Sequence, residues 1–82
     1  MLIKKYHVSN VHNNQIVGFA ELYYDKIRRD MCLAYYNYDY TEPHIYHFYV
    51  GSKSFHQIIN QTEIWLEKLN LEFSKNDNKI IL

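Results

Sequence analysis

The chain has little of what would assign a function directly: one cysteine, one proline, two glycines and no excess charge in 82 residues. The single cysteine, Cys32, excludes an intrachain disulfide. Small secreted domains usually depend on several disulfides, so we expect a reducing cytoplasm. The isolated glycines at 18 and 51 exclude glycine-rich phosphate-binding loops. No stretch approaches the roughly 18 apolar residues of a membrane span, and no apolar run follows the N-terminal lysines, so we expect neither a span nor a signal peptide.

Charge and length limit the expected partners and the number of domains. Nine Lys and Arg balance nine Asp and Glu. Nucleic acids and anionic membranes are bound largely through excess positive charge, so neither is expected as the main partner. The length predicts a single domain, 1–82, with a modest core. A neutral surface gives little mutual repulsion, which favours association with a partner.

One strong helix signal lies near the C-terminal end. Apolar residues recur at helical spacing along one stripe. They are Phe55, Ile58, Ile59, Trp65, Leu66 and Leu69, with Thr62 completing the stripe. Ser54 and Gln57 have the spacing of a capping box, which marks the first turn. The sequence therefore predicts a helix over about 54–73.

Strand patterns precede the helix. Segments 2–8, 16–24, 31–40 and 44–50 are rich in β-branched and aromatic residues and are separated by turn-forming residues. Short connections join antiparallel neighbours. The predicted fold is α+β, a four-stranded antiparallel meander with the helix on one face. Residues 79–82 could add a short final strand.

The alternation of side chains divides each predicted strand between the two faces of the sheet. Small residues at the centre of one set, among them Gly18, Cys32 and Ala34, indicate the face that a helix approaches. That set is Leu2, Tyr6, Val8, Ile16, Gly18, Ala20, Leu22, Tyr24, Cys32, Ala34, Tyr36, Tyr38, Tyr46, Phe48 and Val50. The opposite set is Val17, Phe19, Glu21, Tyr23, Met31, Leu33, Tyr35, Asn37, Ile45, His47 and Tyr49.

The second set predicts a binding surface. An antiparallel sheet usually turns a polar face to water, whereas this set is largely apolar and aromatic. Its candidate partner-binding residues are Phe19, Tyr23, Leu33, Tyr35, His47 and Tyr49, with Arg28 and Arg29 as a basic rim. Two alternatives stay open: residues 79–82 could fold over this face, or a one-residue slip in one strand could exchange the sets.

Catalytic and metal sites are weakly supported. His44 and His47 lie three residues apart on a strand and so point to opposite faces, which does not suit a shared metal ion. Cys32, placed on the core side, is expected to be inert. Glu21, Arg28, Arg29 and His47 could serve a small ribonuclease, but no spacing indicates it. We therefore assign no catalytic residue, metal or cofactor.

A base-stacking platform is the main alternative. The tyrosines and phenylalanine of 31–50 could stack on RNA or DNA bases. The same segment contains no Lys or Arg, so the electrostatic part of nucleic-acid binding is missing.

The sequence thus favours a non-catalytic protein that binds another protein, or a second copy of itself, through an aromatic sheet face. In size, neutrality and aromatic surface the chain resembles the small inhibitor proteins of phages and mobile elements. That resemblance implies a bacterial host enzyme as partner.

Overall fold

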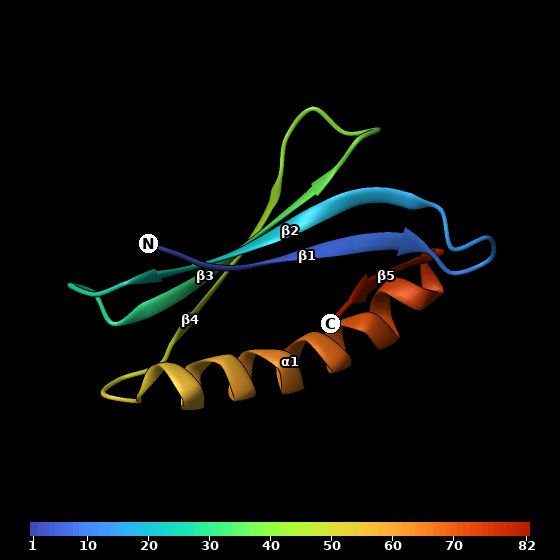
Figure 1. The fold of residues 1–82 in the computed structure, drawn as a ribbon. Helices are drawn as coiled ribbons and strands as arrows, with labels where there is room; N and C mark the ends of the chain where they lie inside the picture. Colours follow the sequence, from blue (N-terminus) through green and yellow to red (C-terminus); the bar gives the residue numbers. More distant parts are fainter.

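The computed structural model describes residues 1–82 and contains one antiparallel sheet with a single long helix across it (Figure 1). In chain order the elements are β1 (Leu2–Asn10), β2 (Ile16–Asp25), β3 (Asp30–Asn37), β4 (His44–Tyr49), α1 (Phe55–Lys75) and β5 (Asn78–Ile81). The sheet order is β4-β3-β2-β1-β5. The first four strands form the predicted meander. α1 then carries the chain from the β4 edge to the opposite edge, where β5 pairs antiparallel with β1.

Local signals define α1 well. Ser54 is the N-cap, and its side chain and that of Gln57 complete the predicted capping box. The buried side of the helix consists of Ile58, Thr62, Leu66 and Leu69. Thr62 is accommodated in the apolar layer because its hydroxyl donates to the Ile58 carbonyl at 2.7 Å. The predicted stripe is therefore the face that packs on the sheet.

The predicted face assignment is wrong in β3. β2 and β3 pair so that Leu22 lies opposite Leu33 and Tyr23 opposite Cys32. Leu33 is therefore on the helix side, together with Met31 and Tyr35, and all three are buried. The cause is the four-residue connection 26–29, which pairs Asp25 with Asp30 and so matches even positions of β2 with odd positions of β3. Cys32, Ala34 and Tyr36 lie on the other face.

Irregular pairing changes two further positions. At the start of β1, Leu2 lies opposite Tyr23 but Lys4 lies opposite Leu22, so Ile3 is an extra residue that packs against the core. Leu2 consequently leaves the helix face. A second shift, near Val8, makes Val17 the extra residue of β2, and Val17 also packs against the core. β-Bulges of this kind re-aim side chains that simple alternation would place elsewhere.

Gly18 is required by a close approach between strands. A Cβ atom at this position would lie 1.9 Å from the carbonyl oxygen of Tyr36 in β3. The sequence indicated that Gly18 makes room for the helix, whereas the contact is with neighbouring backbone. The glycine lets β2 and β3 pair closely where β3 ends.

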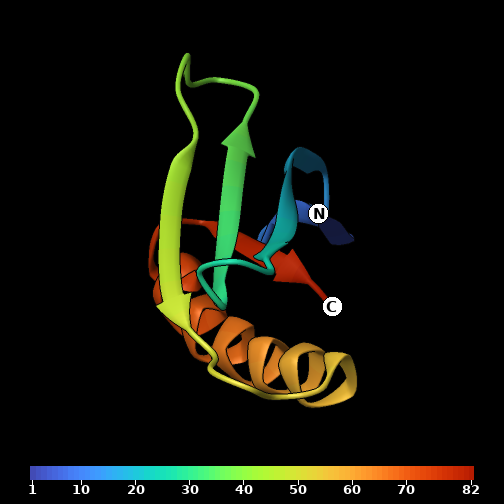
Figure 2. The ribbon, with the colours of Figure 1, turned by 90° about the vertical axis from the view of Figure 1, so that its left-hand side faces the viewer.

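The C-terminal strand extends the sheet and does not cover it. Asn70 of α1 donates its amide to the Ile80 carbonyl at 2.8 Å and accepts from the Ile80 N–H. Ile80 is buried between α1 and β1. In Figure 2, the red β5 follows directly from the end of α1, and it pairs with β1 at the edge of the sheet. The alternative in which residues 79–82 cover the opposite face is therefore wrong.

Candidate functional site: the open sheet face

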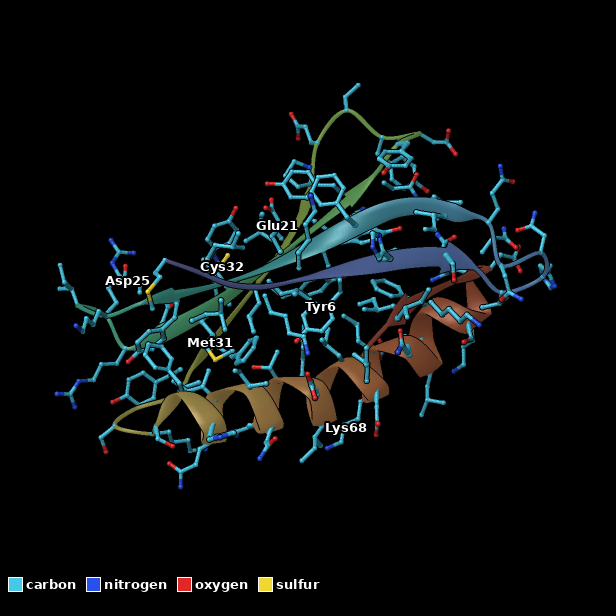
Figure 3. The ribbon with its side chains drawn as sticks, viewed as in Figure 1. Tyr6, Glu21, Asp25, Met31, Cys32 and Lys68 are labelled. Atoms are coloured by element: carbon cyan, nitrogen blue, oxygen red, sulfur yellow. The ribbon has the colours of Figure 1, made fainter.

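One face of the sheet has no covering element. α1 and the core lie on one side, as Figure 3 shows for Tyr6 and Met31, which point toward the helix. Glu21 and Cys32 are labelled on the other side of the sheet. We call this second side the open face. From the strand pairing it consists of Leu2, Lys5, His7, Phe19, Glu21, Tyr23, Cys32, Ala34, Tyr36, Ile45, His47 and Tyr49.

An aromatic cluster lies on the open face toward the end of the sheet that is away from the β2–β3 turn. The rings of Phe19 and Tyr36 stack with centroids 4.7 Å apart, and Tyr38 approaches Phe19 at 6.4 Å. The Lys5 ammonium lies 4.3 Å from the Phe19 centroid, a cation–π distance. Phe19 and Tyr36 remain partly exposed. The cluster is thus held in place by its own contacts and presents a broad apolar surface to solvent.

The apolar surface continues toward the β4 edge. Ile45 is 46% exposed and Tyr49 is 74% exposed. At the far end of the face, Leu2 is 51% exposed beside Tyr23. Partial burial, with the neighbouring Glu21 carboxylate, raises the pKa of Tyr23. Its hydroxyl, neutral near pH 7 like that of any tyrosine, adds a polar group to this end of the face.

Six of the eight predicted site residues are exposed or partly exposed. Phe19, Tyr23, His47 and Tyr49 lie on the open face, and Arg28 and Arg29 are exposed at the adjoining turn. Leu33 and Tyr35 do not belong to the site, because they are buried under α1.

Tyr35 instead organises polar groups inside the fold. Its hydroxyl accepts from Asn37 at 2.9 Å and from Asn78 at 3.4 Å, which links β3 to β5. Its ring packs on Phe73 of α1 at 5.0 Å. Burial raises the pKa of this hydroxyl. Tyr35 is a structural residue.

Sequence reasoning missed Tyr36 as a site residue and placed it against the helix. A usable signal was present, because Met31, Leu33 and Tyr35 offer more apolar volume than Cys32, Ala34 and Tyr36. The more apolar set of a strand is the better candidate for the core.

The β2–β3 turn forms a basic tip beside the open face. Ile27 is 94% exposed there, next to Arg28 and Arg29. The Asp25 carboxylate accepts from the backbone N–H groups of Ile27 and Arg28, at 2.9 and 3.1 Å. These hydrogen bonds lower the pKa of Asp25. Arg29 has a φ of 53°, which closes the turn in the left-handed region. The turn thus presents one apolar side chain among cationic ones.

A cysteine, a histidine and an aspartate meet where this turn joins the open face. Cys32 lies opposite His47, and the Nδ1 atom of His47 is 3.9 Å from an Asp30 oxygen. That distance is too long for a hydrogen bond. Burial, with the charge of Asp30, raises the pKa of the Cys32 thiol. Nucleophilic cysteines need a lowered pKa, so this arrangement does not activate the sulfur.

No family model, curated protein or solved structure matches the chain. No group of three or more His, Cys, Asp or Glu side chains is placed to hold a metal ion. No helix combines the length and apolar character needed to cross a membrane. The open face is therefore the feature of the molecule that bears on function.

Proposed function

We propose that the protein is a non-catalytic binding module that holds a protein partner on its open face. The observation that carries the proposal is an aromatic and apolar sheet face with neither α1 nor β5 over it. Exposed surfaces of this kind usually mark contacts with other proteins. Tyrosine-rich surfaces suit this use, because each side chain offers a large contact area and a hydroxyl at low entropic cost.

Charges around the face indicate the kind of partner. The Phe19–Tyr36 stack lies toward one end of the face and Arg28 and Arg29 stand at the opposite end, with Lys5 and Glu21 between them. A matching surface would carry an apolar region at one end and acidic groups at the other, since rim charges guide encounter and orientation. In its most concrete form the proposal is a phage- or mobile-element-type inhibitor acting on a bacterial enzyme in the cytoplasm. The chain's size and neutrality support that form.

The test compares two double variants in affinity capture from a bacterial lysate. Tyr23→Ser with Tyr36→Ser removes two aromatic rings from the open face. Ile64→Ser with Leu71→Ser is the matched control, since these side chains are 59% and 71% exposed on α1. Far-UV circular dichroism verifies that both variants are folded.

We expect the open-face variant to lose the captured protein and the helix variant to retain it. Equal capture by both variants would refute the assignment of the open face. Retention of RNA or DNA that falls steeply with added salt would assign the face to nucleic acid instead.

A further inference from the structure

β4 is an edge strand without the usual protection. Figure 2 shows it as the outermost strand, with no element along its outer side. Segment 44–50 contains no Lys, Arg, Asp or Glu. Proteins usually guard exposed edges with charged side chains, because free N–H and C=O groups pair readily with another strand. The opposite edge follows that rule, since β5 has only four residues and includes Lys79.

The pairing of β4 with β3 identifies the free backbone groups. The Val50 N–H donates to the Arg29 carbonyl at 3.1 Å, which makes these two a hydrogen-bonded pair. Hydrogen-bonded and non-hydrogen-bonded pairs alternate along an antiparallel ladder. In the observed register, Ile45, His47 and Tyr49 therefore direct their N–H and C=O groups away from β3. The side chains of the same three residues lie on the open face.

We propose that β4 pairs antiparallel with β4 of a second copy of this chain, about a two-fold axis at His47. In this register, Ile45 of each copy lies opposite Tyr49 of the other. All the outward N–H and C=O groups of the three edge residues are then paired. The edge is self-complementary, as a two-fold interface requires.

The side chains of both faces fit this arrangement. On the open face, an aliphatic residue meets an aromatic one at each end of the pair, a favourable cross-strand combination. On the helix face, Tyr46 of one copy meets Phe48 of the other. Both rings already pack on Trp65, at 5.5 and 5.0 Å. Pairing would shield this aromatic group from water at the edge.

The paired form would have one continuous ten-stranded sheet, because each copy contributes five strands. The two-fold axis would be perpendicular to the sheet, so both helices would lie on one side. The two open faces would join into a single surface of twice the area. This inference rests on the β4 edge and does not depend on the proposed function.

The test alters the one side chain that would lie opposite the same residue of the second copy. Across the axis, His47 of one copy lies opposite His47 of the other. His47→Lys therefore places two like charges directly opposite, at the point where the strands must meet. His7→Lys is the charge-matched control, since His7 is exposed on the open face in β1, away from β4. His47→Gln removes the imidazole without adding charge.

Light scattering across a wide concentration range gives the solution mass of each protein. We expect a concentration-dependent dimer for the unaltered chain, the His7→Lys variant and the His47→Gln variant. The His47→Lys variant should dissociate with a dissociation constant at least about tenfold higher. Trp65, the only tryptophan, should report the same transition by fluorescence.

Each other outcome overturns the proposal. A monomer at every concentration excludes the pairing of β4 edges. A dimer that survives His47→Lys uses another surface. Loss of the dimer in both lysine variants assigns association to the open face itself.

Discussion

Replacement of Leu33 by alanine tests the reassigned face of β3. Leu33 has no exposed surface and lies between Leu22 and Tyr46 on the helix side. The substitution removes three buried carbons, worth about 2.4 kcal/mol at about 0.8 kcal/mol each. The remaining cavity raises the expected loss to about 3–4 kcal/mol. That is a large part of the roughly 5–15 kcal/mol that stabilises a domain.

Tyr36→Ala is the comparison, because the same strand presents Tyr36 on the open face. Its ring is partly exposed and stacks on Phe19. Loss of that contact should cost about 1 kcal/mol. Urea denaturation followed by circular dichroism gives the free energy of unfolding of both variants. A cost below about 1 kcal/mol for Leu33→Ala, with a larger cost for Tyr36→Ala, would refute the assignment.

The remaining predictions concern stability. Gly18→Ala should lower the free energy of unfolding by about 3 kcal/mol or more, measured by thermal unfolding, because the new Cβ would lie 1.9 Å from a β3 carbonyl oxygen. A change under about 1 kcal/mol would show that the strands separate easily. The Tyr6 hydroxyl is buried without a hydrogen-bond partner. Tyr6→Phe should therefore leave the free energy of unfolding unchanged or raise it by up to about 1 kcal/mol, measured by urea denaturation. A clear loss of stability would show that the hydroxyl has a partner. Burial, with the charge of Glu63, raises the pKa of Tyr6 from 10.0 to about 12. The unfolded chain therefore releases its proton first, and between these pH values stability should fall by up to about 1.4 kcal/mol per unit, a component that Tyr6→Phe should lack. Asn70→Ala removes both hydrogen bonds to Ile80. Amide hydrogen exchange at Ile80 should then be faster by about tenfold or more. An unchanged exchange rate would mean that pairing with β1 alone holds β5 in place.

Local patterns predicted most of the fold. The apolar stripe and the Ser54–Gln57 spacing define α1 because a helix depends on neighbours three and four residues apart. The four meander strands were identified for a similar reason, since alternation and turn residues are short-range features. The predicted α+β class and the short final strand are confirmed.

The register between strands was not predictable in the same way. The four-residue connection between Asp25 and Asp30 decides which side of β3 faces the helix. A connection one residue longer or shorter would turn Leu33 to the open face and Tyr36 to the helix side. The bulges at Ile3 and Val17 were not predictable either, because their positions depend on pairing with a neighbouring strand. The observed register therefore removes Leu33 and Tyr35 from the candidate site, because both are buried under α1.

The pairing partner of β5 also depends on tertiary contacts. Residues 79–82 are apolar enough to cover the open face or to extend the sheet. The bidentate contact from Asn70 to Ile80 favours the place beside β1. No sequence pattern announces that contact, because it joins a helix side chain to strand backbone.

Labelling of Cys32 shows whether a bound partner covers the open face. This only cysteine lies on the open face between Tyr23 and His47, and a second copy paired through β4 would leave it accessible. A maleimide reacts with it at mildly alkaline pH, since burial and Asp30 raise the pKa of the thiol. We expect labelling of the free protein and strong protection in the complex retained from a lysate. Equal labelling rates in the two states would contradict the claim that the open face holds the partner.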